Sequence, residues 1–386
     1  MDHTQSPPGW KEELDPAGGG YRPGRRVVRA RGLSLMHPFL RLCPDCGVPL
    51  SISRNHSWKE DGRILSPDSA QRLVIMERRV VEGILRRAAE MFGEEASRIL
   101  TRCKAMDAFL YVRSIMTGWK RMAAKAPFGG RHFYDLLCDQ ARILGMADAR
   151  VISYRKRREL LVGCTQCYSE AFFAGDVLGA VQAGEGREAE VTFWEEKGEK
   201  RFGVTIGGRE VPTPVLPTFE EDPLPGNIVY RRCERCRAPF PVSFFAWDTA
   251  RGLVLDTHNG ETVAMLDTAG MNAAYLEIKR TRLPELDELL AREIKEMVDR
   301  VLPRLEWKRR GPEERVRDLF FLAYRGMGNP IFTRGSGKFL EARVENPFNH
   351  PIVAGITASF LSRGEPVSWE WERKERAALE VRVSFL

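Results

Sequence analysis

The chain of 386 residues has no apolar segment long enough to cross a membrane as a helix. Its apolar runs, such as Leu319 to Ala323, are short, whereas a spanning helix needs about 20 apolar residues. The N-terminus has neither the compact apolar core nor the small-residue cleavage site of a secretion signal. The sequence therefore predicts a cytoplasmic protein without a membrane span.

Recognisable catalytic motifs are also missing. The sequence contains no His-Glu-x-x-His, no Gly-x-Ser-x-Gly, no Gly-x-Gly-x-x-Gly after a predicted strand and no Gly-Lys-Ser/Thr loop. Its six histidines form no cluster with metal or triad spacing. These absences favour a binding protein over an enzyme, although the residues leave the question of catalysis open.

Charge is modest for a chain of this length. Much of the net charge of +7 lies in two runs, Arg22 to Arg31 and Arg155 to Arg158, and the pI is near 9.0. Such runs are typical of a solvated surface with a flexible basic tail. A basic stripe is also the electrostatic footprint of a nucleic-acid binder, so a zinc-ribbon nucleic-acid binder is kept as one alternative.

Cysteine, in contrast, occurs in a pattern. Six of the eight cysteines form three Cys-x-x-Cys pairs, Cys43/Cys46, Cys164/Cys167 and Cys233/Cys236. In a chain without an export signal this spacing indicates metal ligands or redox groups before structural disulfides. Cys103 and Cys138 stand alone on predicted helix faces, where core packing is expected.

The pattern repeats on either side of a proline-rich segment. Residues 1–32 are predicted to be a disordered basic tail and residues 207–226, with five prolines, a linker. Adding 190 to early positions of the first copy (33–206), or 180 to later ones, reaches identical residues in the second copy (227–386). The matched pairs are Cys43/Cys233, Cys46/Cys236, Pro49/Pro239, Ser53/Ser243, Gly62/Gly252, Leu65/Leu255, Leu160/Leu340, Ala174/Ala354, Gly175/Gly355, Gly184/Gly364, Glu185/Glu365 and Glu190/Glu370. This many identities in order predict an internal duplication.

Both copies predict the same order of elements. Strand-like residues follow the first and third Cys-x-x-Cys pairs (50–53 and 240–245), and a Gly-Met turn separates helices from strands. The expected helices cover 73–91, 99–115, 133–144, 286–305 and 316–324. The expected strands cover 160–162, 172–181, 190–206, 339–344, 352–361 and 367–386. Separate blocks of helices and strands predict an α+β fold with two tandem copies of a helical layer on an antiparallel sheet.

The first and third pairs predict a metal site. In Cys43-Pro44-Asp45-Cys46-Gly47 the Pro and Gly favour a tight knuckle that brings both thiolates to one ion. A closed structural zinc site needs four ligands, and each knuckle supplies two. If the copies pack about a pseudo-twofold axis, Cys43, Cys46, Cys233 and Cys236 would meet around one zinc ion. The alternatives are Cys43/Cys46 with Cys164/Cys167, or separate or absent sites.

One segment of each copy resembles a known family. Ser169 to Gly179 (SEAFFAGDVLG) and Val344 to Phe348 (VENPF), continuing to Ala354-Gly355, resemble the 4-vinyl reductase or hydrocarbon-binding domain, which is related to lipid-binding subunits of vesicle-tethering complexes. The resemblance covers roughly 70–206 and 265–386. Typical members carry cysteines near the end of the domain, and this chain has none there.

The resemblance implies a pocket for a small apolar or aromatic ligand between the helices and the sheet. Its candidate wall residues are Phe109, Tyr134, Tyr168, Phe172 and Phe173. We therefore expect a zinc-containing, ligand-binding or sensor-like protein, with a protein partner as a further option. The alternative is an enzyme or accessory factor acting on a hydrophobic intermediate. That alternative would give the unrepeated Cys164/Cys167 pair a redox or second-metal role.

Overall fold

The computed structural model describes residues 41–66, 71–116, 129–217, 222–281, 285–301, 318–375 and 377–386. The predicted basic tail lies outside these residues. None of the helices in them combines the length and apolar character that a bilayer crossing requires. Within the described part the fold is α+β, and every strand pairing is antiparallel.

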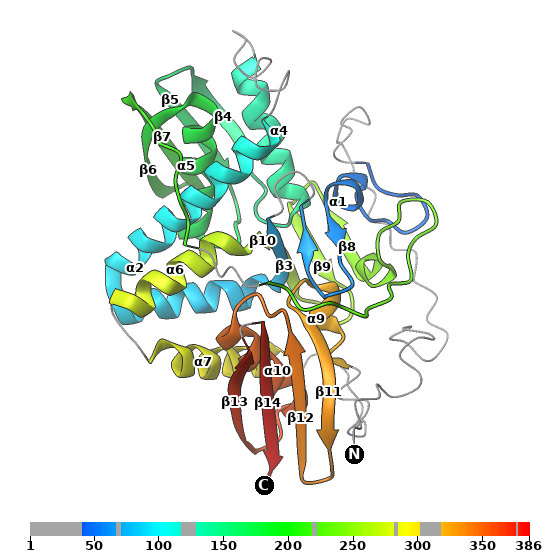
Figure 1. Cartoon of the computed structure of the whole chain (residues 1–386). Helices are drawn as coiled ribbons and strands as arrows, with labels where there is room; N and C mark the ends of the chain where they lie inside the picture. The colour runs from blue at the N-terminus through cyan, green and yellow to red at the C-terminus, as the bar shows by residue number, and fades with distance from the viewer. Residues whose placement is uncertain are drawn as a thin grey trace.

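A six-stranded sheet lies at the centre of the molecule, between two four-stranded sheets (Figure 1). Its strand order is β1-β2-β3-β10-β9-β8. The strands are β1 (Ser57–Trp58), β2 (Ile64–Leu65), β3 (Arg72–Glu77), β8 (Phe245–Asp248), β9 (Leu253–Asp256) and β10 (Thr262–Asp267). The two halves of the chain thus share one sheet, since three of its strands come from each half.

The two halves meet where β3 pairs with β10. Ile75 lies opposite Met265 at the middle of this pairing, and Glu77 lies opposite Val263. Four consecutive residues are buried in each strand, Leu73 to Met76 and Val263 to Leu266. Such continuous apolar runs are expected where both faces of a strand are covered. The junction between the halves is therefore part of the main hydrophobic core.

The two outer sheets have the same strand order. One is β4-β5-β7-β6 and the other is β11-β12-β14-β13. The bounds are β4 (Arg150–Arg155), β5 (Glu159–Cys164), β6 (Arg187–Glu196), β7 (Glu199–Glu210), β11 (Asn329–Gly335), β12 (Phe339–Glu345), β13 (Val367–Glu375) and β14 (Ala378–Phe385).

Helices fill the space between these sheets. They are α1 (Leu50–Asn55), α2 (Arg78–Ile115), α4 (Gly129–Ile143), α5 (Glu170–Glu185), α6 (Thr268–Thr281), α7 (Leu286–Val301), α9 (Phe321–Tyr324), α10 (His350–Ser362) and the 3-10 helix η2 (Phe240–Phe244). The long helix α2 packs against α5. Gly179 makes this packing close, because a Cβ there would lie 2.1 Å from the carbonyl oxygen of Ala105. In the second half, α10 packs on α7 in the same way, and a Cβ on Gly355 would lie 2.3 Å from the oxygen of Ala291.

Several predicted strands are wrong. Segments 172–181 and 352–361 lie in α5 and α10, and 50–53 and 240–245 fall mostly in α1 and η2. Helices α5 and α10 are apolar around most of their circumference because they are surrounded by protein, so their sequences lack the 3.6-residue period of a surface helix. The single strands expected over 190–206 and 367–386 are hairpins, β6–β7 and β13–β14.

Helix boundaries also differ from the prediction. Leu73 and Met76 belong to β3, and the helix begins at Arg78. The helix predicted to end at residue 91 instead continues through Gly93, which only kinks α2, with a φ of 65° that glycine adopts readily. The predicted linker begins inside β7, which continues to Glu210, and residues 211–217 and 222–226 have no helix or strand. Helix α4 and the turns at Gly145 and Gly326 agree with the prediction.

Candidate functional sites: a four-cysteine cluster and an apolar cavity

The first and third cysteine pairs form two similar knuckles. The N–H of Cys43 donates to the oxygen of Val48 (2.8 Å), and the N–H of Gly47 donates to the oxygen of Cys43 (2.8 Å). In the other knuckle the N–H of Cys233 donates to Ala238 (2.9 Å) and that of Arg237 to Cys233 (2.9 Å). Gly47 and Arg237 both have positive φ, 75° and 65°. Each chain reversal is tight enough to direct two thiols to the same side.

The four thiols of these knuckles meet at one point. The Sγ atoms of Cys43 and Cys233 are 3.9 Å apart, and those of Cys46 and Cys236 are 3.4 Å apart. All four Sγ atoms lie within 4.8 Å of one another. A tetrahedral ion with metal–sulfur bonds of about 2.3 Å sets its sulfurs roughly 3.8 Å apart, close to these distances. The cluster can therefore hold one metal ion, as the spacing of the first and third pairs predicted.

The electrostatics around the thiols are uneven. Burial, together with the neighbouring thiols of Cys236 and Cys233, raises the pKa of Cys46. Burial also opposes ionisation of Cys233, but backbone N–H groups of Cys236 and Arg235 and the nearby thiols outweigh it and lower the pKa of Cys233. Backbone N–H groups thus stabilise a thiolate in this knuckle, which is the form that binds a metal. An ion pair of 3.8 Å between Asp45 and Arg235 links the knuckles at the surface.

The second cysteine pair lies elsewhere. Cys164 is buried at the end of β5, and Cys167 precedes α5. The side chain of Asp148 accepts from the backbone N–H groups of Thr165 (2.8 Å) and Gln166 (3.0 Å), which fixes the loop between the two thiols. Hydrogen bonding to Cys164 lowers the pKa of Cys167 and raises that of Cys164. Neither thiol joins the four-cysteine cluster, so the arrangement of Cys43/Cys46 with Cys164/Cys167 is not the one observed.

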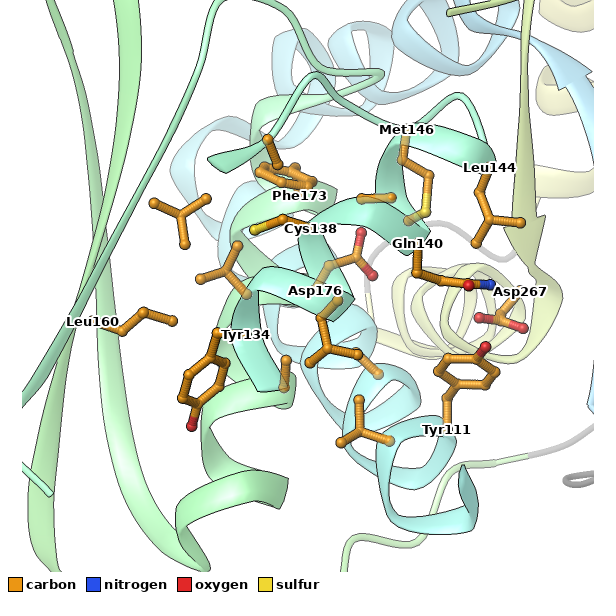
Figure 2. A pocket seen from close by; sticks show the side chains of 18 residues that line it. Tyr111, Tyr134, Cys138, Gln140, Leu144, Met146, Leu160, Phe173, Asp176 and Asp267 are labelled. Atoms are coloured by element: carbon orange, nitrogen blue, oxygen red, sulfur yellow. The ribbon is translucent and has the colours of Figure 1, made fainter. Parts of the chain in front are cut away.

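An apolar cavity lies between helices α2, α4 and α5 and the strand β5 (Figure 2). Its volume is about 100 Å³. The lining is mostly aliphatic and aromatic, and two carboxyl groups, Asp176 and Asp267, point into it. The other lining residues are Ala108, Tyr111, Val112, Tyr134, Leu137, Cys138, Gln140, Ala141, Leu144, Met146, Ala149, Leu160, Val162, Phe173, Val177 and Ala180.

The five predicted wall residues divide between this cavity and the core. Tyr134 and Phe173 line the cavity. Phe109 and Tyr168 are buried without lining it, and Phe172 lines a separate apolar pocket between α2, α6 and α7. The sequence analysis did not predict the two carboxyl groups, because nothing local distinguishes them from surface acids. Asp176 and Asp267 come together only through the packing of α5 and β10.

The carboxyl groups belong to a buried polar cluster. Lys104, 1% exposed, donates to Asp107 (2.9 Å) and forms an ion pair with Asp176 (3.5 Å). The hydroxyl of Tyr168 also donates to Asp176 (2.8 Å). No donor contacts Oδ1 of Asp267, although this atom is buried. One ammonium group therefore faces three carboxyl groups in this part of the described structure.

This excess of buried acid shifts several pKa values. Burial, partly offset by Lys104 and Tyr168, raises the pKa of Asp176 to about 6. Burial and the charge of Asp107 raise the pKa of Asp267 to about 7. Burial opposes the charge of Lys104, but the three carboxyl groups outweigh it and raise the pKa of Lys104. The cluster is therefore short of positive charge near neutral pH.

Comparisons of the chain with protein-family models, curated proteins and solved structures gave no match. The resemblance to the hydrocarbon-binding domain thus stays a prediction from the sequence. The cysteine cluster and the cavity carry the functional argument.

Proposed function

We propose that this protein is an internally duplicated binding protein, in which a zinc ion joins the two halves and the first half binds a small apolar or aromatic molecule. The observation that carries the binding function is the cavity between α2, α4, α5 and β5. Ligand sites are typically concave and mostly apolar, with few polar groups that orient the ligand, and the cavity meets this description.

The duplication is supported by contacts that relate residues 190 positions apart. Ile75 pairs with Met265, and the thiols of Cys43 and Cys46 lie next to those of Cys233 and Cys236. Each of these pairs differs by 190 in number, as expected where two equivalent halves meet on a pseudo-twofold axis.

Reciprocal contacts between the halves also support the duplication. The indole N–H of Trp58 donates to the oxygen of Tyr324 (2.8 Å), and that of Trp247 donates to the oxygen of Ile143 (3.0 Å). Each tryptophan thus caps the end of a helix in the other half, next to that half's Gly-Met turn. Such an exchange of equivalent contacts is the pattern of an isologous interface within one chain.

A sulfur-binding metal suits the thiol cluster, and zinc is the one that we propose. Four cysteine thiols in two knuckles, with separations near those of a tetrahedron, favour zinc or iron over oxygen-preferring ions. A structural site of this kind would join the first and third cysteine pairs, one from each half, and so stabilise the sheet that the halves share.

Metal content of the purified protein tests the zinc assignment. We expect one zinc per chain by elemental analysis, and its loss together with a lower unfolding temperature in Cys43→Ser and in Cys236→Ser. Cys103→Ser is the matched control, because Cys103 is a buried cysteine outside the cluster. Full zinc content and unchanged stability in both knuckle variants would refute the assignment.

Mass spectrometry of the denatured protein tests the binding function. An apolar small molecule should co-purify at a stoichiometric level and should be lost from Ala180→Trp, which would fill the cavity. Recovery of no such molecule from either the native or the recombinant source, together with no binding of any apolar probe, would refute it.

The enzymatic alternative rests on Cys164 and Cys167. The loop held by Asp148 and the depressed pKa of Cys167 would suit a reactive thiol. Under this alternative, Cys167→Ser would abolish a redox activity while zinc content stays intact. The nucleic-acid alternative gains no support from the four-cysteine cluster, since such a cluster stabilises proteins of many functions.

A further inference from the structure

The polar end of the cavity is the first feature in which the two halves of the molecule differ. By the offsets of 190 and 180, the residues of the second half that correspond to Lys104, Asp107, Tyr168 and Asp176 are all apolar: Ile294, Met297, Phe348 and Ile356. The structure supports the first of these correspondences, since Gly175 contacts Lys104 and Gly355 contacts Ile294 at corresponding places in the α2–α5 and α7–α10 packing. The second half therefore folds with an apolar core at this place. The buried charges of the first half are not required by the fold.

The second difference concerns the partner of a strand carboxyl group. The carbonyl oxygen of Arg325 accepts from the N–H of Ile75 (2.9 Å), and the carbonyl oxygen of Leu144 accepts from the N–H of Met265 (2.8 Å). Arg325 and Leu144 thus occupy corresponding positions against β3 and β10. Two residues further along each strand stand Glu77 and Asp267.

These carboxyl groups differ in their neutralisation. Arg325, 1% exposed, donates to Glu77 (2.6 Å) and also pairs with Asp256, while its guanidinium stacks over Phe321 at 4.9 Å. At Asp267 the corresponding residue is Leu144, which lines the cavity and carries no charge. Oδ1 of Asp267 is buried without a hydrogen-bond donor. A buried carboxylate oxygen without a donor raises the free energy of the folded state, so a bound cation at this place would stabilise the fold.

We infer that the cavity binds a small organic cation, an apolar or aromatic group bearing a protonated amine, and that Asp267 and Asp176 bind the ammonium group. The ligand would supply at Asp267 the charge that Arg325 supplies at Glu77. Figure 2 shows Asp267 at one side of the cavity beside Gln140 and Tyr111, Asp176 nearer the middle beside Cys138, and the apolar residue Leu160 at the opposite side. This inference rests on the proposed binding function and specifies its ligand class.

Size limits the apolar group. The cavity of about 100 Å³ is smaller than the roughly 150 Å³ cavities that take up benzene, so a single ring with a short amine arm enters only if the lining side chains move apart. Benzylamine is therefore a probe at the upper limit of size. Ethylbenzene is its neutral counterpart, with a methyl group in place of the ammonium group.

Methionine-methyl NMR of the full-length, metal-loaded protein can follow binding, because Met146 lines the cavity. We expect benzylamine to shift the Met146 signal with an affinity at least tenfold higher than that of ethylbenzene. Asp267→Asn should weaken benzylamine binding about 10- to 100-fold, the range for a lost charged hydrogen bond, and leave ethylbenzene binding within threefold. Glu195→Gln, an exposed acid on β6, is the control and should change neither.

A second variant supplies an internal cation. Leu144→Arg should place a guanidinium beside Asp267, as Arg325 lies beside Glu77, and should abolish binding of both probes. Equal binding of ethylbenzene and benzylamine, or unchanged benzylamine binding in Asp267→Asn, would overturn the cation assignment but leave an apolar ligand site. Binding of neither probe, with no co-purifying apolar molecule, would overturn the assignment and the proposed function together.

Discussion

Neutralising Asp267 should stabilise the ligand-free protein, although most changes to buried polar residues destabilise. One oxygen of the carboxyl group is buried without a donor, and the group faces Asp107 and Asp176 with Lys104 as the cation of the cluster. Asp267→Asn keeps the size of the side chain and removes the charge. Asn also suits the residue preceding a helix, here α6, as well as Asp does.

The sign of the stability change follows from the direction in which the pKa of Asp267 is shifted. The pKa of Asp267 is about 7 in the folded protein against the ordinary value of 3.8, so the folded state binds the proton more tightly. The stability contributed by this proton is fully present below pH of about 4 and is lost as the pH rises to about 7. Asp176, with a pKa of about 6, contributes in the same direction in the protein and in the variant.

The magnitude has an upper limit. At about 1.4 kcal/mol for each pKa unit, the ionised Asp267 costs the folded state at most about 4 kcal/mol at pH 8. Local relaxation and water entry reduce this, so we expect Asp267→Asn to gain about 1–3 kcal/mol at pH 8 and at most about 1 kcal/mol at pH 4.5, with the larger gain at pH 8.

Urea unfolding at both pH values, with zinc held constant, measures the difference. Glu195→Gln should stay within about 0.5 kcal/mol of the native protein throughout. A variant that is less stable than the native protein at pH 8, or a gain that is equal at both pH values, would refute the view that Asp267 is an uncompensated buried acid.

Other changes test packing and the two cysteine sites. Gly179→Ala should destabilise by about 3 kcal/mol or more in thermal unfolding, because its Cβ would overlap the backbone of Ala105, whereas Gly208→Ala, with open space around it, should be nearly neutral. Lys104→Met should cost about 3–5 kcal/mol, since it leaves buried carboxylates without their cation, and Asp176→Asn in the same chain should recover part of that loss in urea unfolding. Trp58→Phe should cost about 1 kcal/mol for the lost hydrogen bond to Tyr324, by the same assay. Chelation by EDTA should lower the unfolding temperature of the native protein, and a Cys164→Ser variant should respond to the same extent, because Cys164 lies outside the cluster.

The sequence by itself determined which four cysteines form the cluster. The thiol types, their Cys-x-x-Cys spacing and the offset of 190 between Cys43 and Cys233 are local or periodic features, and they led to the cluster that the structure contains. The same holds for α4 and α7, whose apolar residues recur on one face because the other face meets solvent. The local sequence pattern is sufficient to predict a helix where one face of that helix is exposed to solvent.

Tertiary structure decided the rest. Helices α5 and α10 were predicted as strands because full burial removes the amphipathic period, and close packing at Gly179 and Gly355 replaced it with small residues. The charge deficit at Asp267 depends on Leu144, which stands 123 positions away in the chain, and on α2 and α5 around it. The energy of a buried charge is set by its neighbours in space, and those neighbours come from three other segments that only the folded chain brings next to Asp267.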